Sequence, residues 1–478
     1  MASTDIDFKQ VQFDFLVSAL HPGLFITTDQ VLEWMEEQNH IVESRIEQIP
    51  LEKLKGWSYT DNRIRHESGK FFSIDGIRIS TNYRGQQTWD QPIINQPEIG
   101  FLGFIVKKFK GIYHFLVQAK IEPGNLNIVQ LSPTLQATRS NYTCVHKGKR
   151  PTYLEYFNGE KPVKTLLDQL QSEQGARFLH KRNRNIIVEV AEDTDIEVKD
   201  GFMWLSLRQI KELISHPNVL NMDTRTVISC ITYGSYDEAT LKLVKTLLSS
   251  RDIHPDGYLY SVLSSDNHLN DLRQIIQWIT ELKFKYELEV KPIGISDMKH
   301  WIYDGNTIYH EDHKYFDVIG VNVAIGNREI ISWDQPMIRS AQEGIMGFLV
   351  KKINGIYHFL VQGKLEAGNF DIVEMAPTVQ CLTGNYQKGK NEYTIPYIEY
   401  FINPPAENVW YSTYQSEEGG RFFHEQNLNI IVEVGDEFPI EVDPNYCWMT
   451  LNQLMSFVTY NNYLNIAARS LLSSIKFN

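Results

Sequence analysis

The stretch that decides the architecture is WDQPIINQPEIGFLGFIVKKFKGIYHFLVQAKIEPGN, which begins at Trp89 and occurs twice in the chain. The second version, WDQPMIRSAQEGIMGFLVKKINGIYHFLVQGKLEAGN, begins at Trp333, so the separation is 244 residues (333 − 89). The same separation carries QSEQGARFLHKRNRNIIVEV at Gln171 onto QSEEGGRFFHEQNLNIIVEV at Gln415. Because the separation stays constant over so long a span, the chain is a tandem duplication of one globular unit, far longer than a solenoid repeat.

The 478 residues therefore divide into two related units and a connection. We predict a first repeat over residues 1–232, a helical linker over 233–270 and a second repeat over 271–478. The hydrophobic content of 42%, with 12% aromatic residues, suits well-filled cores and argues against disorder.

The bulk properties exclude several classes of partner. A net charge of −13 argues against a general binder of nucleic acid or anionic membrane, since those need a basic surface. No apolar run approaches the ~20 residues of a membrane span. The N-terminus MASTDIDFKQ has no export signal, and the four cysteines form no CxxC pair. We therefore expect a cytoplasmic protein with no nucleic-acid partner, no membrane partner and no structural metal.

Within each unit the sequence predicts an α+β arrangement with a central hairpin. Asn354-Gly355 between apolar runs is a strong signal for a type I′ turn, and Lys110-Gly111 takes its place in the first unit. A two-residue turn would set Lys107 opposite His114 and Gly103 opposite Gln118. YLEYF, from Tyr153, is predicted as a further strand, and Ser172 is predicted to cap a short helix.

Side-chain alternation gives the second hairpin strand one apolar and one polar face. The polar face carries His114, Gln118, Lys120 and Glu122. One interpretation is a solvent-exposed face. The other is a binding site, which we favour because the glycine opposite Gln118 would leave room for a bound molecule.

Two local patterns point to a site for a diphosphate. The loop ATRSNYT concentrates Arg139, Asn141 and Tyr142, and the planar fork of an arginine matches phosphate oxygens. Arg177 and Lys181 lie in a basic cluster of an otherwise acidic chain, although Lys181 could also belong to a solvated loop. The second unit has Thr383 in place of Arg139 but keeps an arginine at 421, so the first unit is better equipped.

The acid–base candidates are carboxylates and imidazoles near the predicted strand faces. Proton transfer requires a group whose pKa lies near the working pH, and the sequence offers four in the first unit: Glu155, Glu173, His114 and His180. The chain contains no Walker A loop, GxGxxG, HExxH or GxSxG pattern, so nucleotide hydrolysis at a P-loop and redox-cofactor chemistry have no support.

The motifs QPEIG, HFLVQAKIEPGN, QLSPTLQATRSNYT, YLEYF and QSEQGARFLHKRNRN closely resemble the nucleoside-diphosphate-hexose 2,3-dehydratases of deoxysugar biosynthesis. The resemblance covers nearly the whole chain, including the duplication. It implies a tandem pair of Nudix-hydrolase-like domains, each a mixed β-sheet flanked by helices, in a homodimer. The Nudix box GX5EX7REUXEEXGU is absent from both halves, which puts metal-assisted pyrophosphate cleavage in doubt.

The implied substrate is dTDP-4-keto-6-deoxyglucose, and the implied reaction removes the C-2 hydroxyl and leaves a carbonyl at C-3. The C-4 ketone acidifies the C-3 hydrogen, so we expect no cofactor and no metal. The 3,4-diketo product would pass to a 3-ketoreductase. On this hypothesis Glu155, Glu173, His114 and His180 transfer protons, and Lys120 and Gln118 contact the sugar. The remaining substrate-binding candidates are Trp89, Arg139, Asn141, Tyr142, Arg177 and Lys181.

The resemblance also implies a second pocket, for which the matching residues are Trp333, Asn385, Tyr386, Arg421 and His424. We predict that the active pocket is built mainly by the first unit, although a pocket composed of both units is equally compatible with the sequence. Two other functions compete: a Nudix-type nucleotide-sugar hydrolase, and a non-catalytic protein that binds nucleotide sugars.

Overall fold

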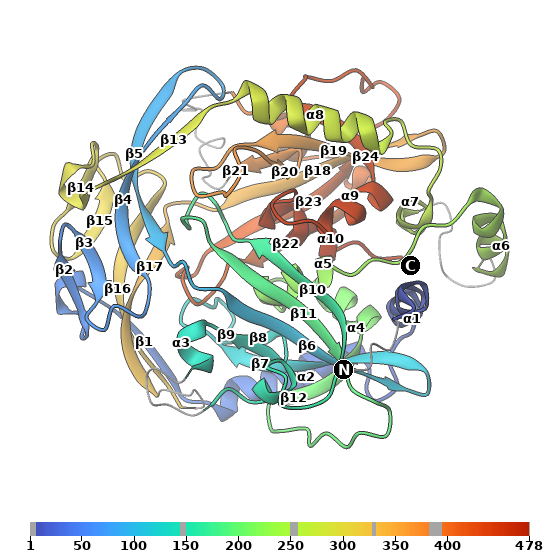
Figure 1. Cartoon of the computed structure of the whole chain (residues 1–478), viewed down its shortest axis with the longest axis horizontal. Coiled ribbons are helices and arrows are strands. Elements are labelled where there is room, and N and C mark those ends of the chain that lie inside the picture. Colours follow the sequence, from blue (N-terminus) through green and yellow to red (C-terminus); the bar gives the residue numbers. More distant parts are fainter. Residues whose placement is uncertain (1–5, 144–149, 249–256, 327–330, 382–393, 478) are drawn as a thin grey trace.

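The computed structural model describes residues 6–143, 150–248, 257–326, 331–381 and 394–477. It is an α+β fold in which four sheets surround a group of short helices (Figure 1). The first half contains α1 (Phe8–Leu20), α2 (Thr28–Ile41), β1 (Ser44–Ile49), η1 (Leu51–Lys53), β2 (Trp57–Thr60), β3 (Arg63–His66), β4 (Ser73–Thr81), β5 (Gln87–Asn95), β6 (Gly100–Phe109), β7 (Ile112–Ile121), β8 (Val129–Ser132), β9 (Leu135–Ala137), α3 (Arg139–Tyr142), η2 (Leu154–Tyr156), β10 (Lys164–Ser172), β11 (Arg182–Glu189), β12 (Phe202–Ser206), α4 (Leu207–Leu213) and α5 (Met222–Ser229).

The connection and the second half repeat this order. They contain α6 (Glu238–Leu248), α7 (Tyr258–Leu263), α8 (Leu272–Lys285), β13 (Leu288–Ile293), η3 (Ile295–Asp297), β14 (Trp301–Tyr303), β15 (Thr307–His310), β16 (Phe316–Ile325), β17 (Ser332–Ser340), β18 (Gly344–Ile353), β19 (Ile356–Lys364), β20 (Glu374–Ala376), β21 (Val379–Cys381), η5 (Ile398–Phe401), η6 (Ala406–Asn408), β22 (Val409–Ser416), β23 (Gln426–Glu433), β24 (Tyr446–Thr450), α9 (Leu451–Val458) and α10 (Ile466–Ser473).

Each half builds one large mixed sheet of seven strands. In the first half the order is β10-β11-β6-β7-β12, with β8 on β7 and β9 on β6, and the β6–β11 pair is parallel. The second half reproduces it as β22-β23-β18-β19-β24 with β20 and β21. Figure 1 shows α4, α5, α9 and α10 between these two sheets. One apolar core runs through both halves, from Val11 to Phe477.

The two smaller sheets exchange a strand between the halves. β1 of the first half pairs with β16 of the second, and β13 of the second half pairs with β4 of the first. These sheets lie together at the left of Figure 1. The halves are therefore interleaved, and each small sheet contains backbone hydrogen bonds that only the other half can supply.

The central hairpin is confirmed at its turn and differs further along. Lys110 and Asn354 both have positive φ, as do the glycines after them, and Lys107 pairs with His114. Beyond Val106 the strands separate, because β8 and β9 enter between them. The Thr134 hydroxyl bridges the gap: it donates to Leu116 O and accepts from Ile105 N.

The predicted pairing of Gly103 with Gln118 is therefore wrong. Gly103 pairs with Leu135 and Ile186, and Gln118 pairs with Ser132 and Phe202. A Cβ on Gly103 would lie 2.3 Å from Cε1 of Phe157, so this glycine makes room for a core ring and not for a bound molecule.

Two other local predictions are also wrong. YLEYF is not a strand: Tyr153 adopts φ 63° and the next residues form the 3₁₀ helix η2. Its ring is held by tertiary bonds, because the hydroxyl donates to Glu197 O and accepts from Lys199 N. Ser172 ends strand β10 instead of capping a helix, and residues 173–181 form a loop that contacts the second half.

Candidate functional site

A cavity of about 430 Å³ opens where the first large sheet meets the two small sheets. The first half contributes the ends of β6, β7, β9 and α3, the loop before β11 and an aromatic group on and beside β2 and β3. The second half contributes the start of β17 and the loop 418–421. The cavity is therefore a composite of both halves, lined mainly by the first. Its polar and charged lining includes Gln96, Lys120, Glu122, Gln136, Ser140, Asn141, Glu173, Lys181, Asn183, Asp223, Glu418 and Arg421.

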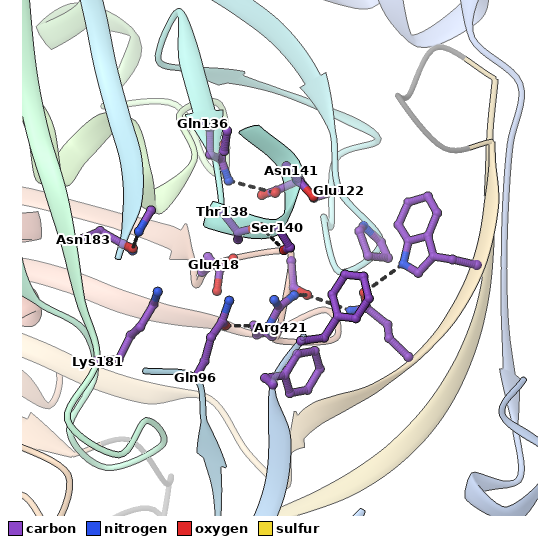
Figure 2. Close-up of a pocket in the computed structure, with 18 of the residues that line it drawn as sticks. Gln96, Glu122, Gln136, Thr138, Ser140, Asn141, Lys181, Asn183, Glu418 and Arg421 are labelled. Carbon is purple, nitrogen blue, oxygen red and sulfur yellow. Dashed lines mark hydrogen bonds between the residues drawn. The ribbon is translucent and has the colours of Figure 1, made fainter. Parts of the chain in front are cut away.

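The polar face of β7 is not a solvent face, and its C-terminal end forms a wall of this cavity. Lys120 and Glu122 are buried and line it, and the Lys120 ammonium donates to Gln136 O at 3.1 Å. The Gln136 amide donates to Glu122 Oε1 at 2.8 Å and accepts from Asn221 Nδ2 at 3.0 Å. Figure 2 shows the Gln136–Glu122 bond at the edge of the cavity. This network fixes the Glu122 carboxylate beside the empty volume.

Two equivalent loops of the duplicated motif, residues 173–181 and 417–425, carry further charged residues of the lining. Each loop packs against the other half. Gly124 N donates to Gly419 O at 2.7 Å, and His424 N donates to Gly124 O at 3.0 Å, so the 418–424 loop is fastened to the end of β7. That attachment brings Glu418 and Arg421 into the cavity. Arg421 Nε donates to Gln96 Oε1 at 3.3 Å, and its guanidinium lies 4.2 Å from the Phe72 ring centroid.

Three carboxyl groups of the cavity, those of Glu418, Asp223 and Glu173, have a raised pKa and hold protons more tightly than free carboxyls do. Burial raises the pKa of Glu418 to about 8, with Glu122 and Glu173 reinforcing the shift and Arg421 opposing it. Burial also raises the pKa of Asp223 well above its usual range, and Glu418, Glu173 and Glu122 add to that effect. A carboxyl with the pKa of Glu418 is suited to donate a proton near neutral pH.

Glu173 lies between a cation and an amide. Asn183 Nδ2 donates to Glu173 Oε1 at 2.7 Å, and the Lys181 ammonium donates to Glu98 O nearby. Burial raises the pKa of Glu173, while Lys181, Arg469 and the Asn183 bond oppose the rise. Burial lowers the pKa of Lys181, which Glu173 and Glu98 oppose. The cavity thus holds carboxyls in contrasting surroundings, the arrangement that separates an acid from a base.

Six of the predicted site residues line the cavity. From the first-unit set these are Lys120, Asn141, Glu173 and Lys181, and from the second-pocket set they are Trp333 and Arg421. The last two were assigned to a separate pocket of the second unit, but they complete the cavity built mainly by the first.

The other acid–base candidates lie outside the lining. His114 is fully buried beside Phe25 and Phe109, with Nδ1 3.0 Å from Ile112 O. Glu155 forms an ion pair with Lys161 at 3.6 Å. His180 is exposed, and its ring packs on Phe370.

The other binding candidates also lie outside the lining. Arg139 is exposed, Tyr142 packs on Phe101, and Gln118 lies within the sheet. Trp89 packs with the first small sheet and donates to Gln91 Oε1. In the second-pocket set, His424 is exposed and stacks on Phe423, while Asn385 and Tyr386 lie outside the described residues.

Arg177 of the first half packs against the second half, and its counterpart Arg421 of the second half packs against the first. Arg177 is buried, its guanidinium lies 4.1 Å from the Phe316 ring centroid, and Glu425, Glu366 and Glu417 of the second half favour its charged form. Arg421 occupies the equivalent position in the cavity of the first half. The exchange follows from the crossing loops, since His180 N donates to Gly368 O and Gly368 N to Gly175 O.

The second half does not repeat the chemistry of the cavity. At the shift of 244 residues, Lys181 corresponds to Glu425, Glu418 to Gln174, Asp223 to Ala467 and Gln96 to Ser340. The Gln174 amide donates to Glu417. The cavity therefore has one more cation and a different set of carboxyls than the equivalent place in the second half.

Sequence reasoning missed Gln96, Gln136, Asn183, Asp223 and Glu418, and named Glu122 only as part of a polar face. The sequence did contain one signal for Glu418, because that position and Gln174 are the one difference between the opening segments QSEQG and QSEEG of the repeated motif. Among the described residues, no group of three or more His, Cys, Asp or Glu side chains could hold a metal ion, and no helix is long and apolar enough to span a bilayer.

Comparison with known proteins identifies the family. The family model for NDP-hexose 2,3-dehydratase matches twice, over residues 28–231 and 272–475. A dTDP-4-dehydro-6-deoxy-alpha-D-glucopyranose 2,3-dehydratase of Saccharopolyspora spinosa is 42% identical over 430 residues, covering 89% of this chain and 87% of the relative. Proteins of the same name from Amycolatopsis orientalis and Streptomyces violaceoruber are 37% and 39% identical. They cover 96% and 93% of this chain, and 92% and 96% of their own lengths. The chain belongs to the NDP-hexose 2,3-dehydratase family.

Proposed function

We propose that this protein removes water across C-2 and C-3 of dTDP-4-keto-6-deoxyglucose in the cavity shared by its two halves. The observation that carries the proposal is the composition of that cavity. It combines buried carboxyls, of which Glu418 is protonated at neutral pH, with Lys120, Lys181 and Arg421 and with aromatic side chains. A nucleotide sugar needs a flat apolar surface for its base, cations for its diphosphate and proton donors and acceptors at its hexose.

The reaction uses the substrate's own ketone as its electron sink. A base removes the C-3 proton, and the C–H electrons form the C-3–C-4 double bond of an enolate. The enolate then reforms the C-4 carbonyl as its electrons enter the C-2–C-3 bond, and the C-2 hydroxyl leaves with a proton from an acid. The product enol carries its hydroxyl on C-3 and tautomerises to the 3,4-diketone. The steps move protons and release one water, and no electrons enter or leave the substrate, so the oxidation state of the whole molecule is unchanged.

The surroundings of the carboxyls support an assignment of roles. Glu418 would protonate the departing hydroxyl, because its pKa of about 8 keeps it protonated at neutral pH. Glu173 would act as base, because burial raises its pKa and so makes its carboxylate a stronger proton acceptor, while Lys181 and the Asn183 amide oppose the rise. Lys120 would donate to the C-4 oxygen as negative charge develops there. Arg421 and Lys181 would hold the diphosphate, and Trp57, Phe72 and Trp333 would bind thymine.

We further propose that each unit has a Nudix-like fold. The mixed seven-stranded sheet, with helices on its faces, supports that assignment. That the protein is a cytoplasmic homodimer whose product goes to a 3-ketoreductase remains a prediction, as do the boundaries of the two units and their linker.

The test is to incubate purified, chelator-treated protein with dTDP-4-keto-6-deoxyglucose and follow the nucleotide sugar by mass spectrometry. We expect loss of one water from the intact nucleotide sugar without added magnesium or NAD. Release of a sugar phosphate would instead identify a Nudix-type hydrolase. Binding of dTDP with an unchanged keto sugar would identify a non-catalytic binding protein.

A further inference from the structure

The duplicated Trp-Asp-Gln motif makes the same set of hydrogen bonds in both halves, but only one set borders the cavity. In the second half, Trp333 Nε1 donates to Gln335 Oε1 at 2.9 Å, and Gln335 Nε2 donates to Gly420 O at 2.7 Å. In the first half, Trp89 Nε1 donates to Gln91 Oε1 at 3.0 Å, and Gln91 Nε2 donates to Ala176 O at 2.9 Å. Both glutamines are buried.

The middle residue of the motif also reaches across to the other half. Trp57 Nε1 donates to Asp334 O at 2.7 Å, and Lys55 N donates to Asp334 Oδ2 at 2.8 Å. The equivalent bonds run from Trp301 and Lys299 to Asp90. Residues 333–335 therefore hold two of the cavity's aromatic side chains, one from each half, at fixed positions.

The carbonyl of Gly420 connects this motif to the cavity's arginine. Gly420 O accepts from Gln335 Nε2 at 2.7 Å and from Arg421 Nη1 at 2.8 Å. Removal of the Gln335 amide would take away the Oε1 acceptor of the Trp333 indole N–H and the bond from Gln335 Nε2 to Gly420 O, while the bonds of this loop to Gly124 and Ile338 would remain. Trp333 is half-buried, so the ring would turn or admit water to give its indole N–H another acceptor.

We infer that Gln335, with Asp334, is a positioning residue that lets the second half fix the base-binding and diphosphate-binding end of a cavity built mainly by the first half. The inference rests on the proposed function for the identity of the ligand. It gives the second half a structural role in this cavity, although the equivalent place in the second half lacks the same charged residues. It also predicts that the loss of this hydrogen-bond pair affects binding more than turnover. Gln335 holds Gly420, next to Arg421, whereas the bonds of Glu418 O to Arg421 N and Phe422 N, and of Gly419 O to Gly124 N, do not involve Gln335.

The experiment compares Gln335→Met with Gln91→Met in the full chain. The two substitutions remove the same pair of hydrogen bonds from matched surroundings, so their effects on thermal unfolding should be similar. We expect Gln335→Met to raise the Kd for dTDP, measured by calorimetry, and the KM for the keto sugar by about tenfold, with kcat within about threefold of wild type. Gln91→Met should change the Kd for dTDP, the KM and the kcat each by less than about twofold.

The inference would be overturned if both variants weakened dTDP binding equally, or if neither variant weakened it. If wild type itself binds no dTDP, the proposed function fails instead, and hydrogen exchange then tests the positioning. Gln335→Met should raise the rate of amide hydrogen exchange in residues 419–424 and leave it unchanged in residues 175–180. Gln91→Met should raise it in residues 175–180 and leave it unchanged in residues 419–424. Any other pattern would overturn the inference. If Gln335→Met does not fold, Trp333→Phe against Trp89→Phe repeats the comparison, because phenylalanine keeps an aromatic ring without the indole N–H.

Discussion

The Nε–H group of Arg421, in the second half, donates a hydrogen bond to Gln96 Oε1 of the first half at 3.3 Å. This contact places a cation of one repeat in the cavity of the other. Arg177, its counterpart, packs on Phe316 instead, and buried carboxyls of the second half favour its charged form. Two arginines that look equivalent in sequence therefore have different surroundings, and they should respond differently to substitution.

Replacing Arg421 with methionine should reduce kcat/KM for the keto sugar by about 100-fold, because a charge-assisted contact to the diphosphate is lost. Steady-state kinetics with wild type and variant measure this. The matched control is Arg139→Met: this side chain is exposed and outside the cavity lining, so near-normal turnover is expected. A severe loss in Arg139→Met with normal Arg421→Met would move the diphosphate to the 138–143 loop.

Arg177→Met should chiefly lower stability. It would leave Glu425, Glu366 and Glu417 buried without this cation, which costs about 3 kcal/mol of unfolding free energy. Urea unfolding followed by circular dichroism measures the loss. The folded fraction should retain most of its specific activity, and an unchanged stability with lost turnover would contradict this account.

Glu173→Gln and Glu418→Gln should each lower kcat by about 100- to 1000-fold, because each removes a proton-transfer group from the cavity. Glu155→Gln and His180→Asn serve as controls, since both side chains lie outside the lining. Single-turnover rates separate this effect from changes in binding. Normal rates in Glu173→Gln and Glu418→Gln would remove these carboxyls from the mechanism.

The pH dependence of kcat should show an alkaline limb set by Glu418. Its carboxyl, with a pKa of about 8, donates a proton below that pH and loses this ability as the pH rises through it. In Glu418→Gln the residual rate should lack this limb between about pH 7 and pH 9. A limb that persists unchanged in the variant would assign it to another group.

Stability should depend on pH through Glu374, which accepts from the Ser172 hydroxyl at 2.9 Å and lies outside the cavity lining. Burial raises its pKa to about 7 from an ordinary value of 4.5. The folded state thus keeps a proton that the unfolded state releases above about pH 4.5. This contribution to the unfolding free energy is fully present below that pH, and it is lost as the pH rises to about 7, by about 3 kcal/mol.

The measurement is urea unfolding of wild type and Glu374→Gln between pH 4.5 and pH 7.5. The variant cannot titrate at this position, so its free energy of unfolding should rise relative to that of wild type as the pH increases across that interval. A constant difference between the two proteins would show that Glu374 does not keep its proton in the folded state.

The sequence by itself determined the features that local chemistry controls. It contained the duplication and the hairpin turns at Lys110-Gly111 and Asn354-Gly355. Periodicity also separated the two faces of β7, and the long motifs identified the family. The turns and the strand faces depend on residues within a few positions of one another, and the duplication and the family are visible from the order of residues alone.

Only the tertiary structure decided which half supplies each side of the cavity. Tyr153 takes a left-handed conformation because distant backbone groups hold its hydroxyl, and a pattern typical of a strand cannot report that. The exchange of Arg177 and Arg421 depends on hydrogen bonds such as Gly124 N to Gly419 O, between residues almost 300 positions apart. Two nearly identical repeats encode the same local preferences, so the sequence could not say whether a loop packs on its own unit or on its partner; the backbone contacts between the units made that choice.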